Sequence, residues 1–207
     1  MNKTSMKATA PRRSTASNAR RGEILEQAIA MFGERGFNGL TIQSLAERCE
    51  ISNAGLLYYF GNKDDLLLAV LDEFDLRERE IMEPLVAAAE CGTGTADVTR
   101  AAVRDLFTTM VGRLAQNVTT TRFLLTLQAE ATDKDHIAHD WFRERDRLAH
   151  ELFTSLLSAI VTDGAATARR LQAHVYGLSL LWLRNDRSFD LSAEWNEAFD
   201  LLVRERL

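Results

Sequence analysis

The segment ISNAGLLYYFGNKDDLL, residues 51–67, decides the fold, because one helix starts after Ser52 and another starts at Lys63. Ser52 is a good N-cap for a short helix over residues 53–60, because its hydroxyl can accept a hydrogen bond from a free backbone N–H group of the first turn. About three residues separate this helix from the one before it, which is the spacing of a helix-turn-helix. The second helix of that motif can enter the major groove of DNA.

Two further helices precede this segment. Apolar residues recur between positions 21 and 35 at spacings of one, three and four, which predicts a helix with one buried face. They are Ile24, Leu25, Ala28, Ile29 and Phe32. We expect Gly36 to end this helix, because glycine takes positive φ at little cost. Thr41 caps the next helix, which ends near Cys49. Glu50 occupies the tight turn where glycine is usual, and a left-handed conformation there costs about 1–2 kcal/mol.

The composition favours an all-α protein. Hydrophobic residues make up 46% of the chain and charged residues 27%, and only two prolines interrupt a sequence rich in leucine and alanine. No apolar run reaches the roughly 18 residues that a membrane helix needs. With two cysteines and no apolar leader, a cytoplasmic location is expected. No phosphate-binding loop, nucleophile elbow, zinc-protease motif or dinucleotide fingerprint is present, so an enzyme is disfavoured.

Charge is divided unevenly along the chain. Residues 1–21 contain six basic and no acidic side chains, whereas residues 22–66 contain three basic and seven acidic ones. The first 20 residues are also rich in serine, threonine and alanine, which predicts a disordered basic arm. It is either a solvated leader or an arm whose Arg12, Arg13, Arg20 and Arg21 contact DNA phosphates. The second interpretation would offset the acidity of residues 22–66.

Together with the upstream GEILEQAIAMFGERGFNGLTIQSLAERC, the segment resembles the TetR family of transcriptional regulators over residues 21–68. The resemblance implies an N-terminal three-helix helix-turn-helix DNA-binding domain, residues 21–66. It also implies a C-terminal helical ligand-binding and dimerisation domain, residues 67–207. The implied partners are double-stranded operator DNA, a small-molecule effector and a second copy of the chain, with no cofactor or metal. A repressor released by its effector is expected. An activator and a regulator controlled by a partner protein are the alternatives.

The resemblance also implies which residues contact DNA. They are Thr41, Gln43, Ser52, Asn53, Ala54, Gly55, Tyr58, Tyr59 and Lys63, in addition to the four arm arginines. Thr41 and Lys63 would hold phosphates at helix starts, where free N–H groups and the helix dipole favour anions. Plain capping is the alternative for Thr41 and Ser52. A surface or packing role is the alternative for Tyr58, a core position for Tyr59, and a solvated charge for Lys63. Because the recognition helix lacks lysine and arginine, base reading falls largely on Asn53.

The remaining sequence predicts a helical bundle. Helices are expected over about 63–82, 97–117, 119–131, 135–162, 165–184 and 192–206, with Pro84 ending the first of them. Residues 91–95, CGTGT, are interpreted as a loop, because no strand precedes them. His136 and His139, near Glu130, could hold a metal ion, but a cluster at a helix start is favoured.

Two sets of residues in the bundle are candidate binding residues. A small-molecule cavity needs apolar walls with a few polar groups, for which the candidates are Phe107, Met110, Phe123, Gln128, Phe142, His150, Phe153 and His174. Plain core is the alternative for these. The resemblance implies that two helices of each chain form a dimer interface, with Gly177, Leu178, Leu181, Trp182, Trp195 and Phe199. These apolar stripes could equally be intramolecular core.

Overall fold

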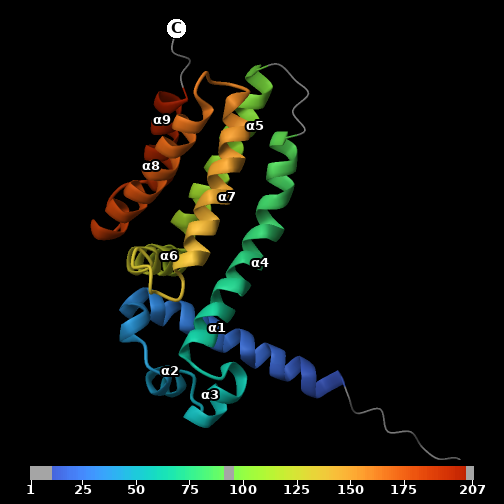
Figure 1. Cartoon of the computed structure of the whole chain (residues 1–207), viewed down its shortest axis with the longest axis vertical. Coiled ribbons are helices and arrows are strands. Elements are labelled where there is room, and N and C mark those ends of the chain that lie inside the picture. Colours follow the sequence, from blue (N-terminus) through green and yellow to red (C-terminus); the bar gives the residue numbers. More distant parts are fainter. Residues whose placement is uncertain (1–10, 91–95, 204–207) are drawn as a thin grey trace, which may run out of the picture.

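The computed structural model describes residues 11–90 and 96–203, and every regular element in these ranges is a helix. The helices are α1 (Pro11–Gly39), α2 (Ile42–Arg48), α3 (Asn53–Phe60), α4 (Lys63–Glu90), α5 (Ala96–Gln116), α6 (Val118–Glu130), α7 (His139–Ser158), α8 (Gly164–Arg184) and α9 (Leu191–Leu202). Figure 1 shows α1, α2 and α3 grouped at one end of the molecule, which we call the N-terminal unit. None of the described helices combines the length and hydrophobicity needed to cross a membrane.

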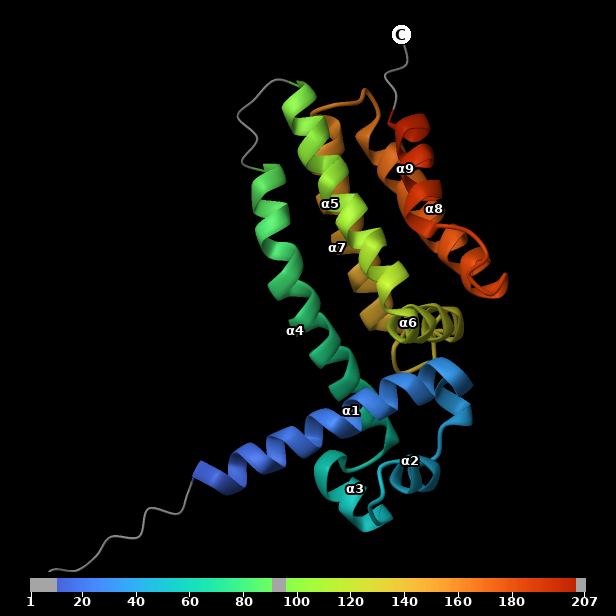
Figure 2. The same cartoon turned by 180° about the vertical axis from the view of Figure 1, so that it is seen from behind.

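The α4 helix links the N-terminal unit to the rest of the molecule. Seen from behind in Figure 2, it extends away from α3 beside α5 and α7, and α8 and α9 lie on the opposite side of that pair. The α6 helix lies across the bottom of this bundle and packs on α1. The bundle therefore touches the N-terminal unit chiefly through α4 and α6. His136, in the turns after α6, also packs on the Phe37 ring.

The predicted disorder of residues 1–20 is wrong for residues 11–20, which form the first turns of α1. Residues 1–10 lie outside the described residues. A helix can begin at Pro11 because the first turn does not use the missing N–H group. Arg20 then holds this part of α1 in place, since its guanidinium bonds to the carboxylate of Glu23 and to the backbone carbonyl of Cys49 at the end of α2.

Pro84 does not end α4, as the sequence predicted, because the helix continues to Glu90. A proline inside a helix removes the hydrogen bond to the carbonyl four residues earlier. Here that carbonyl belongs to Glu80, an exposed residue where water can replace the lost donor. The turn beyond Pro84 places Leu85 and Val86 against the core of the bundle and buries Ala89. This apolar burial offsets the cost of the proline.

The other predicted helices are confirmed, with shifted ends. The α7 helix begins at His139 rather than near residue 135, because residues 132–138 form a series of turns. Asp133 stabilises these turns, since its carboxylate accepts the N–H group of Asp135 and its carbonyl accepts that of His136. The predicted loop at residues 91–95 and the predicted end of the last helix at Arg206 lie outside the described residues.

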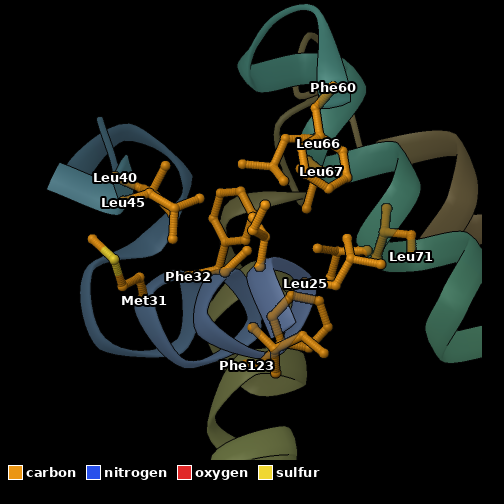
Figure 3. Close-up of a cluster of buried hydrophobic side chains, with 14 of the residues drawn as sticks. Leu25, Met31, Phe32, Leu40, Leu45, Phe60, Leu66, Leu67, Leu71 and Phe123 are labelled. Carbon is orange, nitrogen blue, oxygen red and sulfur yellow. The ribbon is translucent and has the colours of Figure 1, made fainter. Parts of the chain in front are cut away.

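One hydrophobic core joins the N-terminal unit to α4 and α6. Figure 3 shows Phe32 of α1 between Leu45 of α2 and Leu67 of α4. Phe123 of α6 reaches the same cluster, with its ring centre 6.5 Å from that of Phe32. All four side chains are fully buried. A second core, made by the end of α4 with α5, α7, α8 and α9, fills the bundle.

Candidate nucleic-acid interface and internal cavity

The two helices of the predicted helix-turn-helix begin at the predicted caps. The Thr41 hydroxyl accepts the N–H group of Ser44 at 3.1 Å, and the Ser52 hydroxyl accepts that of Gly55 at 3.0 Å. Between the helices, Glu50 has a φ of 55°, the left-handed conformation expected at the tight turn. Leu45 and Leu56 fill the space between α2 and α3 and are fully buried. The motif is therefore formed as the sequence predicted.

The α3 helix has one buried and one exposed side. Leu56 and Phe60 are buried against the rest of the N-terminal unit. Ser52, Asn53 and Ala54 are exposed at the start of the helix, and Tyr58 is 85% exposed. The predicted contacts Gln43 and Thr41 are exposed on α2, whereas Gly55 and Tyr59 are half-buried. An amide, hydroxyls and a phenol are thus exposed on the helix-turn-helix, as contacts to DNA would require.

Lys63 is bonded inside the protein. Its ammonium donates to the carbonyl of Phe37 at 3.1 Å and lies 4.2 Å from the centre of the Phe37 ring. It also reaches the carbonyl of Leu40 at 3.4 Å. These contacts join the start of α4 to the end of α1. A phosphate contact by Lys63 stays a prediction, and it would compete with these bonds.

Most described basic side chains of the N-terminal unit are paired. Arg48 binds Glu34 at 2.9 Å, which also lowers the pKa of that carboxyl. Arg21 lies over the Phe60 ring at 5.3 Å. With Arg20 bonded to Glu23, neither Arg20 nor Arg21 belongs to a free arm. The backbone of Arg12 and Arg13 is helical, but their side chains lie outside the described residues.

A cavity of about 710 Å³, partly open to solvent, lies between α4, α5, α6, α7 and α8, and Glu26 and Ile29 of α1 also line it. Met110, Gln128, Phe142 and Phe153 line it, as the sequence predicted. Most of the remaining wall is apolar, including Leu114, Leu148 and Val175. Its volume is within the range of roughly 300–1,000 Å³ that small-molecule sites occupy.

Four of the predicted cavity residues lie elsewhere. Phe107 is fully buried behind the wall residue Phe153, with the ring centres 4.5 Å apart, and Phe123 belongs to the core shared with the N-terminal unit. His150 contacts Gln172 through Nδ1 at 3.1 Å, and His174 packs against Trp195. The prediction failed here because core and cavity walls have the same residue types, and sequence periodicity does not distinguish them.

The sequence interpretation missed the charged part of the cavity wall. Arg113 of α5 pairs with Glu78 of α4, and Arg145 of α7 pairs with Asp75 of α4 at 3.3 Å. A signal was present, because each arginine follows a correctly predicted wall residue, Met110 or Phe142, by three positions and so shares its helix face. Ion pairs across the cavity were not visible in the sequence, since their partners lie far away along the chain.

Tyr176 also lines the cavity. Its hydroxyl donates to a carboxylate oxygen of Asp146 at 2.7 Å. Burial raises the pKa of Tyr176, and the hydrogen bond to Asp146 raises it further. The phenol is therefore neutral at physiological pH, and its proton is already used by Asp146.

The two histidines near Glu130 have separate partners. His136 accepts the N–H group of Ala138 at Nδ1, and His139 contacts the carbonyl of Ala131. The carboxylate of Glu130 accepts the backbone N–H group of Phe37 at 2.7 Å. Within residues 11–90 and 96–203, no three histidine, cysteine, aspartate or glutamate side chains are placed to hold a metal ion.

The predicted dimer-interface residues divide into two sets. Trp182, Trp195 and Phe199 are buried in the chain's own second core, so their assignment to a subunit interface is wrong. Trp195 and Phe199 pack around the ring of Phe107. In contrast, Gly177 and Leu181 are exposed on α8, and Leu178 is half-buried. Intramolecular packing accounts for the first set because α9 folds back on α5.

Comparison with known proteins matches the N-terminal part of the chain to a defined family. A family model described as bacterial regulatory proteins, tetR family, matches residues 24–70. The transcriptional repressor KstR2 of Mycobacterium tuberculosis is 40% identical over 70 residues, which cover 32% of this chain and 35% of KstR2. In sequence, the match therefore spans about a third of this curated relative.

Solved structures resemble nearly the whole chain. FadR of Bacillus subtilis, in complex with stearoyl-CoA, has a TM-score of 0.65 and 20% identity, covering 87% of this chain and 96% of FadR. AibR, in complex with isovaleryl coenzyme A and operator DNA, has a TM-score of 0.62 and 20% identity, covering 89% and 98%. At this identity the likeness shows a shared fold. Residues 24–70, which contain the helix-turn-helix, are thus the part of the chain that matches the bacterial regulatory proteins of the tetR family in sequence.

Proposed function

We propose that this protein is a DNA-binding transcriptional regulator that responds to a small molecule. In its simplest form it is a cytoplasmic repressor, and an effector in the cavity releases it from operator DNA. The family of residues 24–70 supports DNA binding. The observation that carries the proposal is that two helices of the cavity wall, α4 and α6, are both attached to the N-terminal unit.

The attachment of α6 is close and polar. The carboxylate of Glu130 accepts the Phe37 N–H group, and the Thr126 hydroxyl donates to the carbonyl of Gly33 at 3.2 Å. The backbones also approach closely, since a Cβ atom on Gly33 would lie 2.9 Å from the backbone nitrogen of Phe123. We therefore expect α6 to move with α1 as one body. A ligand that changes the spacing of the cavity walls would then reorient the recognition helix.

The surface of α8 supports a homodimer. Leu180 is 43% exposed and Leu181 is 50% exposed. Gly177 lies on the same side of the helix, and nothing lies within 4 Å of a Cβ atom built on it. A second copy packed on this stripe would bury it and present two recognition helices to DNA. Half-sites about 34–36 Å apart, one turn of B-DNA, fit such a pair.

The structural neighbours support an acyl compound as the first effector to test. FadR was solved with stearoyl-CoA, and AibR with isovaleryl coenzyme A and operator DNA. The largely apolar wall of this cavity suits an acyl chain. An effector acts only through its preference for one of the two states. Full switching, from 1:99 to 99:1, requires a preference of about 5.5 kcal/mol.

Selection of duplexes from a random pool, followed by fluorescence anisotropy, tests DNA binding. We expect a selected duplex to bind at low salt and stearoyl-CoA to weaken that binding. Asn53→Ala should weaken binding about 5- to 150-fold, the range for removal of a bidentate hydrogen bond to a base. Ser188→Ala, an exposed position far from α3, should change little. Protein that binds no duplex at low ionic strength would refute the proposal.

A further inference from the structure

The cavity wall contains a charged group with unused hydrogen-bonding capacity. Arg113 of α5 binds the carboxylate of Glu78 on α4 through Nη2. Its Nε atom is buried and has no hydrogen-bond partner among the described residues. A buried donor without a partner is costly, so such groups are rare in folded proteins unless a ligand or water completes them. Both Arg113 and Glu78 line the cavity.

The neighbours of this group on the wall are apolar. Met110 and Leu114 lie on α5 within one helical turn of Arg113, and Ile81 and Met82 continue the wall on α4. A ligand that fills this space would contact hydrocarbon over most of its surface. It could reach the Arg113 donor with a single polar group. The wall therefore combines a large apolar surface with a buried donor, the Nε atom of Arg113, that has no partner among the described residues.

The acidic side chains of the wall do not favour a cationic ligand. Five carboxylates line the cavity, from Glu26, Asp75, Glu78, Glu80 and Glu144. Four of them are bonded to arginines: Glu26 to Arg77, Asp75 to Arg145, Glu78 to Arg113, and Glu144 to Arg147. What the wall lacks is thus a hydrogen-bond acceptor for the cationic guanidinium of Arg113.

We infer that the effector is an apolar molecule carrying a carbonyl or carboxylate oxygen that accepts a hydrogen bond from the unpaired Nε of Arg113, and that this oxygen competes with Glu78 for the charge and orientation of the guanidinium. The inference deepens the proposed function and rests on it. Because Glu78 lies on α4 and Arg113 on α5, the competition weakens an ion pair that joins these two helices. Since α4 directly follows the recognition helix α3, weakening this ion pair lets α4 and the recognition helix move.

Three ligands with matched chains test the ligand class. Decanoate, decanamide and decylamine would be titrated into the full-length protein, with calorimetry and tryptophan fluorescence as readouts, since Trp141 is the one of the three tryptophans that lines the cavity. We expect decanoate and decanamide to bind at least about tenfold more tightly than decylamine, because only they present an oxygen to Arg113. A stronger response to decanoate than to decanamide would identify a carboxylic acid, and equal responses a neutral carbonyl compound.

Paired variants test whether Arg113 binds the ligand oxygen. Arg113→Met with Glu78→Gln removes the donor without leaving an unpaired charge, and it should lower decanoate affinity about tenfold or more. Arg145→Met with Asp75→Asn removes the neighbouring wall pair and is the matched control, for which the selectivity should persist. Circular dichroism and thermal melting would verify that both variants fold. Equal affinity for all three ligands, unchanged selectivity in the Arg113 variant, or no binding of either oxygen ligand up to about 1 mM would overturn the inference.

Failure of the inference and failure of the proposed function give different results. If the wild-type protein binds its selected duplex but ignores both oxygen ligands, the inference is wrong and the regulator stands. If decanoate binds in an Arg113-dependent way but no duplex binds, the ligand site stands and the proposed regulator is wrong. Glu78→Gln alone adds a third measurement. This variant should weaken duplex binding in the absence of ligand if the Arg113–Glu78 ion pair holds α4 in its DNA-binding position.

Discussion

Gly36 is the residue at which the chain turns from α1 towards the recognition motif. Its φ of 71° is in the region that favours glycine. The turn directs the N–H group of Phe37 to the carboxylate of Glu130, on α6. The sequence predicted the glycine and its role as a helix stop. It gave no indication of the carboxylate, which comes from a helix 93 residues later.

Gly36→Ala should destabilise the protein strongly. An alanine Cβ atom would lie 2.2 Å from Oε1 of Glu130. With φ 71° and ψ −179°, Gly36 lies in a region that is essentially restricted to glycine, which costs another residue about 1–3 kcal/mol, and loss of the Phe37 bond costs about 1–3 kcal/mol. We expect urea denaturation to show a fall of about 2–6 kcal/mol in the free energy of unfolding.

Gly22→Ala is the matched control, because a Cβ atom there meets nothing within 4 Å inside α1. It should raise the free energy of unfolding by about 0.5–1 kcal/mol. If Gly36→Ala were as stable as the wild type, the turn at Gly36 would not depend on glycine.

At the scale of elements, α4 shows how packing can override a local signal. Pro84 was expected to end the helix, yet α4 continues for six residues beyond it to Glu90. Proline inside a helix carries a free-energy cost that burial of the following turn can offset. The sequence correctly indicated that Pro84 is unfavourable in the helix. It did not reveal the hydrophobic partners of residues 85–89, because they come from the second core.

Pro84→Ala should stabilise α4. Alanine restores the hydrogen bond to the Glu80 carbonyl, and proline is about 3 kcal/mol less favourable than alanine inside a helix. Since proline also restricts the unfolded chain by about 0.4–1 kcal/mol, the expected net gain is about 2 kcal/mol in urea denaturation. The exposed neighbour Glu83→Ala should stay within about 0.5 kcal/mol of wild type. A destabilised Pro84→Ala protein would mean that the native helix requires the proline.

At the scale of the whole molecule, the described N-terminal unit has few free basic side chains. Arg20 and Arg48 are ion-paired and Arg21 lies over the Phe60 ring, which leaves Arg35 exposed. Affinity for phosphates then depends largely on the start of α1. Replacing Arg12 and Arg13 with alanine should weaken duplex binding and reduce the salt dependence of log K by about 0.9 for each phosphate that is no longer neutralised. Anisotropy titrations over a range of salt concentrations measure both quantities. An unchanged slope would show that these two arginines do not contact DNA.

The proposed dimer makes a second prediction at this scale. Leu181→Arg places a charge in the exposed α8 stripe and should convert the dimer to a monomer, because an unpaired charge in an apolar interface is costly. Light scattering after size-exclusion chromatography gives the mass. Val98→Arg, at an apolar position of α5 that is 54% exposed, is the matched control and should leave the mass unchanged. A wild-type monomer would disprove the proposed dimer.

The sequence by itself determined the helix-turn-helix of the N-terminal unit, but not the first turns of α1. The caps Thr41 and Ser52, the glycine at Gly36 and the left-handed turn at Glu50 are local features, and each depends on residues a few positions away. Most helices of the bundle also followed from periodicity. Only the tertiary structure decided which faces of those helices form core, cavity or surface. Phe107 and Phe153 have the same side chain on apolar helix faces, but only Phe153 lines the cavity. The difference arises because a wall position is defined by what the other helices leave unfilled, and that depends on partners distant in the sequence.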